Sequence, residues 1–349
     1  MTSLKANFNE LLPGKVFLEN GQVTFIEKYL KDRKWIEPDD RVINVEKPGE
    51  GNMNFVRRIL TEKKLSFIIK QSRPWVEKYP HLSAPAERIV VEKTYYETIK
   101  ESKTLIGYSP DLLHFDDENF IMVLEDLGEA ADFSHVYKKD RHFTQTEITQ
   151  AVAYLNRLGK ISHVKSYPEN KALRELNHQH IFHLPFIFEN GFNLDSVQEG
   201  LQSLSEKAKS DTALKDNVAA LGEIYLGKGT VLLQGDFYPG SLLKVKDSVK
   251  VIDPEFSFLG PAEWDIGVFM AHLFMSGASE DLIGSAYKQF DKREDFNVAR
   301  FSGFVGVEIL RRLIGLAQLP LEMELEQKAR LIDQSMLWIS NGHIDILEQ

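Results

Sequence analysis

Three carboxylates flank two short apolar segments, 242–245 (LLKV) and 249–252 (VKVI), in a way that could support chemistry. Asp236 lies shortly before the first segment, and Asp253 and Glu255 directly follow the second. The three polar residues between the segments predict a β-hairpin, which would carry the acids from both flanks to one end of a small sheet. One carboxylate could then accept a proton from a hydroxyl while two others hold a divalent cation, as phosphoryl transfer requires.

Acids at loop ends also cap helices and solvate turns, so this interpretation needs support from the rest of the chain. Segments 41–45, 53–60 and 65–70 read as three strands joined by short turns, which predicts an antiparallel meander. The turn PGEGN joins the first two strands. A glycine-containing turn between strands can cover nucleotide phosphates, although most such turns only reverse the chain.

The third strand ends at Lys70, which could reach a phosphate or extend along the sheet edge into water. A helix is predicted over 85–100, and its Glu92 or Glu87 could hold that lysine. A buried strand over 120–124 follows, and it ends in the polar sequence EDLGE.

Beyond this point the pattern becomes helical. Thr144 and Glu147 have the spacing of a capping box, and periodicity predicts that 264–349 is mostly helix. We therefore expect an α+β fold of the protein-kinase-like bilobal type. Its parts would be a small antiparallel-sheet lobe over 1–125 and a mainly helical lobe over 126–349.

Composition narrows the functional classes. The chain has 349 residues and a formal net charge of −10, which argues against general binding to nucleic acids or anionic membranes. It has no cysteine, which excludes disulfides and thiolate chemistry. The N-terminal segment shows no secretory pattern, and no apolar run approaches the length of a membrane span. These features predict a cytoplasmic protein, and a homodimer is possible.

Taken together, the motifs resemble the aminoglycoside phosphotransferase and choline kinase superfamily, and most of all the methylthioribose kinases. The similar segments are EGNMN, QGDFYPGS, DPEFSFLGP with a following WDIG, and ILRRLIGLAQ, which together extend from Gly49 to about Gln318. The resemblance implies a kinase-like fold that uses ATP and magnesium to phosphorylate a hydroxyl of a small molecule. The best guess for that acceptor is 5-methylthioribose or a related sugar.

The resemblance also implies roles for particular residues. Asp236 would be the catalytic base, and Asp253 and Glu255 would bind magnesium. Nucleotide contacts would come from Gly51, Asn52, Asn54, Lys70, Glu92, Glu125 and Leu127, the last two in an adenine hinge. Arg311 or Arg312 would meet the substrate, together with Trp75.

The sequence departs from the superfamily pattern at two positions. Gln234 replaces the histidine that usually precedes the glycine and aspartate, and Ser241 replaces an asparagine that many members use for a second metal contact. Ser241 fits the methylthioribose kinase pattern. Gln234 does not, but a glutamine can still form hydrogen bonds with the loop backbone. Asp265 of WDIG is expected to fix the same loop.

Alternatives remain open at this point. The acceptor could be an aminoglycoside or choline-like cation, or the protein could bind nucleotides without catalysis. Two neighbouring arginines would favour a neutral or anionic acceptor over a cation. Because neighbours differ by about 100° around a helix, Arg311 and Arg312 should not point the same way, and at least one should lie at the border of the apolar face.

Two further features have plain structural explanations. The segment NHQHIFH contains His178, His180 and His183, but only the last two have helical spacing, and a helix in the substrate lobe is favoured over a zinc site. Trp75 could approach the substrate or simply pack beneath a proline-rich loop.

Overall fold

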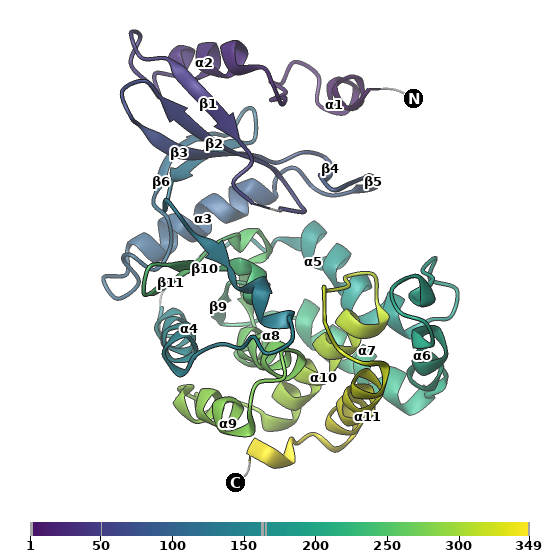
Figure 1. Cartoon of the computed structure of the whole chain (residues 1–349). Coiled ribbons are helices and arrows are strands. Elements are labelled where there is room, and N and C mark those ends of the chain that lie inside the picture. The colour runs from purple at the N-terminus through teal and green to yellow at the C-terminus, as the bar shows by residue number, and fades with distance from the viewer. Residues whose placement is uncertain (1–2, 50, 162–163, 165, 348–349) are drawn as a thin grey trace. The chain divides into compact units, whose positions relative to one another are not determined.

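The computed structural model describes residues 3–49, 51–161, 164 and 166–347. The chain folds into two compact units, Met1–Glu129 and Ala130–Gln349. Figure 1 shows strands of the first unit in purple and blue, and the helices of the second in teal to yellow. The division falls a few residues after the expected boundary at 125, at the end of the polar sequence EDLGE.

The first unit is built on an antiparallel sheet. Its elements are α1 (Leu4–Leu11), α2 (Val23–Asp32), β1 (Val42–Glu46), β2 (Phe55–Thr61), β3 (Ser66–Gln71), β4 (Trp75–Val76), β5 (Tyr79–Ser83), α3 (Arg88–Lys100), β6 (Leu112–Asp116) and β7 (Ile121–Glu125). Five strands form one sheet in the order β1-β2-β3-β7-β6, and β4 and β5 pair separately. The predicted meander, the strand over 120–124 and the helix over 85–100 are confirmed.

The core of this unit follows from the alternation of side chains along the strands. Ile59 of β2, Ile69 of β3 and Val123 of β7 are buried on one face of the sheet. Ile26 and Leu30 of α2 belong to the same cluster and are fully buried. Helices α1 and α2 and the edge strand β6 were not predicted from the sequence.

The second unit is mostly helical. Its helices are α4 (Gln145–Leu158), α5 (Lys171–His178), α6 (Leu201–Ser210), α7 (Thr212–Leu226), α8 (Glu263–Met275), α9 (Glu280–Gln289), α10 (Val298–Ile314) and α11 (Leu325–Asn341). Its strands are β8 (Ala131–Asp132), β9 (Val231–Leu233), β10 (Leu242–Val245), β11 (Ser248–Val251) and β12 (Phe258–Gly260). Short helical turns are η1 (Phe133–Tyr137), η2 (Gln179–His183), η3 (Leu184–Phe186), η4 (Leu194–Ser196), η5 (Pro239–Ser241), η6 (Pro254–Phe256) and η7 (Asp345–Leu347).

Two predictions about local structure in this unit are confirmed. Thr144 and Glu147 form the capping box at the start of α4. β10 and β11 form the antiparallel hairpin, with Val245 opposite Ser248, so its turn is one residue shorter than the sequence suggested. The expected α+β class, with an antiparallel sheet first and a mainly helical region after it, is also confirmed.

Helices α8 and α10 form the centre of the second unit (Figure 1). α10 is buried without interruption from Phe301 to Ile314, since it packs against α8 and α11. A helix that is buried around its whole circumference also buries any charged side chain it carries. Arg311 and Arg312 lie in its last turn, and each is only 6% exposed.

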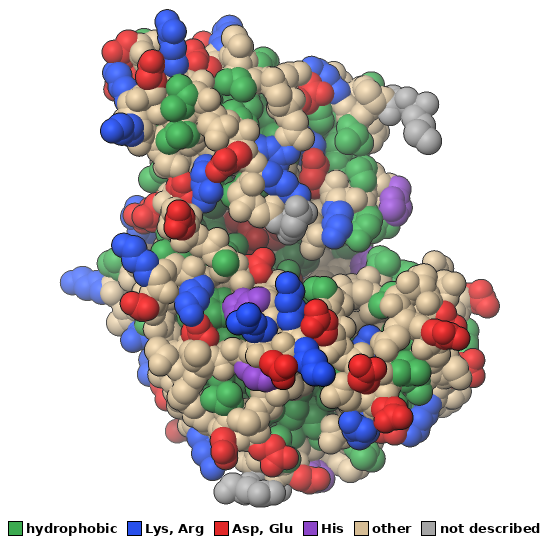
Figure 2. Space-filling model, viewed as in Figure 1, with side chains coloured by type: hydrophobic (Ala, Val, Ile, Leu, Met, Phe, Trp, Pro, Cys, Tyr) green, Lys and Arg blue, Asp and Glu red, His purple; other side chains and the backbone are tan. Residues whose placement is uncertain are grey.

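The surface carries charges of both signs. On the face shown in Figure 2, acidic and basic side chains are mixed over each unit. Among the residues that the structure describes, none of the helices is long and apolar enough to cross a membrane.

Candidate active site

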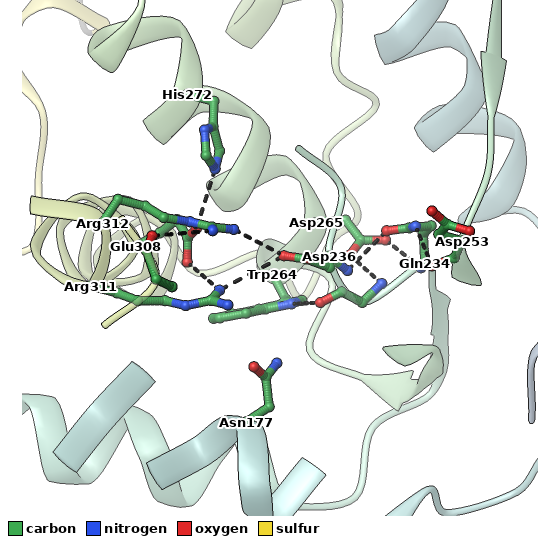
Figure 3. A network of polar contacts seen from close by, with 12 residues as sticks. Asn177, Gln234, Asp236, Asp253, Trp264, Asp265, His272, Glu308, Arg311 and Arg312 are labelled. Atoms are coloured by element: carbon green, nitrogen blue, oxygen red, sulfur yellow. Dashed lines mark hydrogen bonds and ion pairs between the residues drawn. The ribbon is translucent and has the colours of Figure 1, made fainter. Parts of the chain in front are cut away.

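The loop that follows β9 carries Asp236 and is held by the first turn of α8. The Asp265 carboxylate accepts hydrogen bonds from the backbone N–H of Gln234 at 2.6 Å and of Gly235 at 3.0 Å. Nε1–H of Trp264 donates to the Gly235 carbonyl at 2.9 Å. Asp265 therefore fixes the loop by hydrogen bonds, as the sequence predicted (Figure 3).

Gly235 is required at this point of the loop. Its φ of +93° lies in the region that favours glycine, and an added Cβ would lie 2.1 Å from the Phe256 carbonyl oxygen. The loop can thus approach the segment that contains Glu255 only because position 235 has no side chain.

Gln234 joins the two acid-bearing segments. Its side-chain oxygen accepts from the backbone N–H of Asp236 at 2.9 Å. Its Nε2 donates to the carbonyls of Ile252 at 2.9 Å and Asp253 at 3.2 Å. The expected bonding of Gln234 to the backbone is confirmed, and an amide suits it because the group both accepts and donates.

Asp253 and Glu255 lie on the turn that follows β11. Asp253 has a left-handed φ of 54°. It is followed by Pro254, whose ring restricts its own φ. Glu255 is 3% exposed. The side-chain amide of Asn170 donates to the Glu255 carbonyl at 2.8 Å and so helps to hold the turn.

The donor set of this turn suits magnesium. In the described part of the chain, no group of three or more metal-binding side chains occurs. Magnesium commonly takes one or two protein carboxylates and fills its other positions with phosphate oxygens and water. Two carboxylates on one short turn therefore fit the ion, provided that a nucleotide supplies the remaining oxygens.

Arg311 and Arg312 both converge on Asp236. Arg312 Nη2 lies 3.3 Å and Arg311 Nη1 lies 3.7 Å from the same oxygen, Oδ1. The expectation that the neighbours would point in different directions is wrong, because the two long side chains curve back to one carboxylate (Figure 3). The expectation that at least one would lie at the border of a buried face is also wrong, since α10 is buried on all sides.

A second carboxylate holds the arginines. Glu308, one turn earlier on α10, accepts from Arg312 Nε at 2.6 Å and from Arg311 Nη1 at 3.0 Å. Glu308 is fully buried, and although burial opposes ionisation, the two guanidiniums hold its pKa well below the usual range.

The environment of Asp236 favours a more basic carboxylate. Burial raises its pKa, and Glu308 and Glu255 add to the increase, while Arg312 and Arg311 act in the opposite direction. The side chain is 16% exposed, so an acceptor can still reach it. A carboxylate with a raised pKa is better suited to accept a proton from a hydroxyl.

The candidate nucleotide residues of the first unit are partly assembled. Lys70 Nζ forms a buried ion pair with Glu92 at 2.7 Å, which confirms Glu92 rather than Glu87 as its partner. Asn54 is buried at the start of β2, whereas Gly51 and Asn52 are exposed. Glu50, in the middle of the predicted glycine turn, lies outside the described residues.

The backbone near the glycine turn is anchored to the rest of the unit. The Asn52 carbonyl accepts from the Lys78 N–H at 2.9 Å, next to the β4–β5 hairpin. Arg88 of α3, itself buried, donates to the Met53 carbonyl at 2.7 Å. These hydrogen bonds fix the backbone just before β2. A turn that covers phosphates would lie directly before this strand.

Of the other candidates in this unit, Trp75 requires a correction. It is 1% exposed and packs with Phe8 and Phe17 in a small aromatic cluster, so its ring has no face left for a substrate. The alternative of a packing tryptophan is the right one. Glu125 ends β7, where its backbone N–H bonds to Asp111, and Leu127 follows in the loop.

The histidine-rich segment forms the end of α5 and the π-helical turn η2. His178 stacks on Phe182, with ring centroids 5.3 Å apart. Burial lowers the pKa of His180, and the charge of Arg311 lowers it further.

The second unit also contains a cavity of about 740 Å³. It is lined by residues of α4, β9 and the segment 290–293. Of the acids described above, which are Asp236, Asp253, Glu255, Asp265 and Glu308, only Asp265 borders it. Asp236, Asp253 and the two arginines are absent from its lining. We therefore place the candidate site at Asp236 and the groups that contact it rather than in this cavity.

Sequence reasoning missed Glu308, His272 and Tyr137. The spacing of Glu308, three and four residues before the arginines, is a signal that could have identified it. Nε2 of His272 lies 3.2 Å from Glu308, and its Nδ1 lies 2.7 Å from the Tyr137 hydroxyl. Nothing in the local sequence around His272 or Tyr137 indicates this contact.

Comparisons with known proteins find kinases that are similar in sequence over most of the chain. The chain is 28% identical to a methylthioribose kinase of Exiguobacterium sibiricum, over 82% of each chain. It is 26% identical to a methylthioribose kinase of Bacillus cereus, over 92% of this chain and 91% of the other. No family model matches the chain.

Solved structures show the same fold at low sequence identity. A spectinomycin phosphotransferase in complex with ADP and spectinomycin has a TM-score of 0.54 and 14% identity, over 93% of this chain and 99% of the other. A Plasmodium vivax ethanolamine kinase has a TM-score of 0.54 and 13% identity, over 97% and 93%. The resemblance to methylthioribose kinases in sequence is confirmed, and the fold is the one seen in these phosphotransferase structures.

Proposed function

We propose that this chain, a homologue of the methylthioribose kinases, transfers the γ-phosphoryl group of ATP to a hydroxyl of 5-methylthioribose or a closely related sugar. The observation that carries this proposal is the convergence of two buried arginines on the partly exposed carboxylate of Asp236. A base and two fixed cations at one point suit a neutral acceptor that loses a proton while negative charge develops nearby.

Each group has a role in the proposed reaction. Asp236 would orient the acceptor hydroxyl and accept its proton, because its carboxylate is made basic by burial and remains reachable. Guanidinium N–H groups of Arg311 and Arg312 that are not engaged by carboxylates would bind oxygens of the acceptor.

The nucleotide would be bound in two ways, through a magnesium ion held by carboxylates and through direct contacts of its phosphates with Lys70. Asp253 and Glu255 would hold a magnesium ion, whose charge offsets that of the phosphates when it is bound. Lys70, fixed by Glu92, would contact the phosphates, with Gly51, Asn52 and Asn54 near them. The backbone at Glu125 and Leu127 would meet the adenine.

Two other functions compete with this proposal. Relatives in fold include proteins named for spectinomycin and ethanolamine, so a cationic acceptor is the main alternative. The two arginines oppose it, because a cation would have to approach two fixed positive charges that Glu308 and Asp236 only balance. A protein that binds nucleotides without catalysis would not need a buried, balanced cluster of this kind.

An acceptor screen tests the proposal. ADP formation from magnesium-ATP would be measured with 5-methylthioribose, ribose, choline, ethanolamine and an aminoglycoside. We expect the highest kcat/KM with 5-methylthioribose. A polycation as the best acceptor would favour the aminoglycoside-type alternative, and no turnover with any acceptor would favour a non-catalytic nucleotide-binding protein.

A further inference from the structure

A chain of buried polar groups extends from the candidate base into the interior of the second unit. It runs from Asp236 through Arg312 and Glu308 to His272 (Figure 3). From His272 it continues to the Tyr137 hydroxyl. Glu308 and His272 are fully buried, and Tyr137 is 3% exposed. Each of these groups therefore depends on the next for its hydrogen bonds, because water does not reach them.

The two arginines are shared between two carboxylates. Figure 3 shows the guanidiniums between Glu308 on one side and Asp236 on the other. The contacts with Glu308 are the shorter ones, at 2.6 and 3.0 Å, compared with 3.3 and 3.7 Å for Asp236. Glu308 thus holds the arginines more tightly than Asp236 does.

Sharing the arginines in this way keeps the base available. Without Glu308, two uncompensated guanidiniums would lie beside a single carboxylate. Each would gain by forming a close fork with Asp236, and that fork would occupy the oxygen that must receive the acceptor's proton. With Glu308 present, the arginines contact Asp236 only at the longer distances of 3.3 and 3.7 Å, so no tight fork closes off the carboxylate from an acceptor hydroxyl.

His272 fixes Glu308 in turn. Glu308 is ionised and can only accept, so the 3.2 Å contact requires a proton on Nε2 of His272. Nδ1 then accepts from the Tyr137 hydroxyl at 2.7 Å. Burial lowers the pKa of His272 to about 4, so the ring stays neutral and keeps this arrangement over the ordinary pH range.

We propose that Glu308 is a positioning residue for the proposed phosphoryl transfer, which keeps the two arginines from forming a tight fork with Asp236, and that His272 and Tyr137 hold Glu308 in place. The inference rests on the proposed function for its kinetic consequence. Its structural part concerns only the bonds among these residues.

The kinetic arm compares three variants in the full-length protein with the best acceptor from the screen. Glu308→Gln keeps the shape and removes the charge. We expect kcat to fall and the acceptor KM to rise, each by about tenfold, with the ATP KM changed by less than about twofold. His272→Leu should shift the same two constants in the same direction by about threefold. His272→Gln, whose amide can still donate to Glu308, should stay within about twofold of wild type.

Glu263→Gln is the matched control. Glu263 is fully buried and accepts from Arg300 at 2.9 Å, so it is a carboxylate of the same kind that touches neither Asp236 nor the two arginines. It should change stability without changing the ratio of the acceptor KM to the ATP KM. Equal effects of Glu263→Gln and Glu308→Gln on that ratio would overturn the proposal.

An arm without activity separates this inference from the proposed function. Exchange of the Arg312 Nε proton with solvent, followed by ¹⁵N-arginine NMR, reports on its bond to Glu308. Exchange should be slow in wild type and in His272→Gln, and at least about tenfold faster in His272→Leu. If Glu308→Gln does not fold, the two His272 variants decide. Unchanged exchange and unchanged acceptor kinetics in His272→Leu would overturn the proposal, whereas a wild type without turnover would refute only the proposed function.

Discussion

At the scale of single residues, Gln234 links the two segments that carry the candidate acids. Gln234 stands where relatives in the superfamily usually have a histidine, and its amide uses both ends. The oxygen accepts from the backbone N–H of Asp236, and the nitrogen donates to the carbonyls of Ile252 and Asp253. One amide thus joins the loop that carries Asp236 to the segment that carries Asp253.

Asp265 yields a prediction about pH. Burial raises its pKa to about 7, although two backbone N–H groups act against the increase. The folded state therefore binds this proton more tightly than the unfolded chain, whose aspartates titrate near 4. The resulting stability is fully present below about pH 4 and is lost as the pH rises through about 7.

Asp265→Asn removes this titration. We expect the thermal midpoint of the wild type to fall more steeply than that of Asp265→Asn between about pH 5 and 8, by an amount equivalent to on the order of 2 kcal/mol. The variant should also be less stable at every pH, because an amide oxygen can serve only one of the two N–H groups well. Parallel curves for the two proteins would show that Asp265 stays ionised throughout this range.

At the scale of elements, α10 is the part that sequence reasoning handled least well. Its apolar residues and its position were predicted, but the arginines were expected to diverge. They converge because the helix is central and offers its last turn no exposed face, so both guanidiniums must find carboxylates inside the unit. Periodicity describes where side chains leave a helix and not where long ones end.

Alanine variants of the two arginines test the role of this helix end. Arg311→Ala and Arg312→Ala should each raise the acceptor KM by about tenfold or more, since each removes a charged donor from the acceptor's surroundings. The KM for ATP should change by less than about twofold. Arg300→Ala, near the start of the same helix, is the control and should leave both constants near wild type. Wild-type acceptor kinetics in both variants would remove the arginines from substrate binding.

At the scale of the whole molecule, the order of helices and strands could be predicted from the sequence more reliably than the long-range contacts between them. The hairpin β10–β11, the meander and the helical second unit follow from local patterns of apolar residues, turns and caps. The helices α1 and α2 were missed although they carry local signals, since Ser3 caps α1 and Ile26, Tyr29 and Leu30 of α2 have helical spacing. Long-range contacts such as Tyr137 with His272, which lie 135 positions apart, leave no mark on local spacing.

The proposed roles fall to residues that are far apart in the sequence. Lys70 and Glu92 pair in the first unit, and the acids and arginines gather in the second. Nucleotide binding is therefore assigned to many groups, and the transfer of the proton to Asp236 alone. A change at Asp236 should separate binding from chemistry, which is a stronger test than a loss of activity by itself.

The most direct measurement is the rate of magnesium-ATP turnover with the preferred sugar in Asp236→Asn, alongside calorimetry of ATP binding to the same variant. Asparagine keeps the size of the side chain and cannot accept the proton. We expect a fall in kcat of about 10² to 10⁴-fold, with ATP affinity within about threefold of wild type. Turnover near the wild-type rate, or a loss of ATP binding that accounts for the loss of turnover, would contradict the assignment of Asp236 as the base.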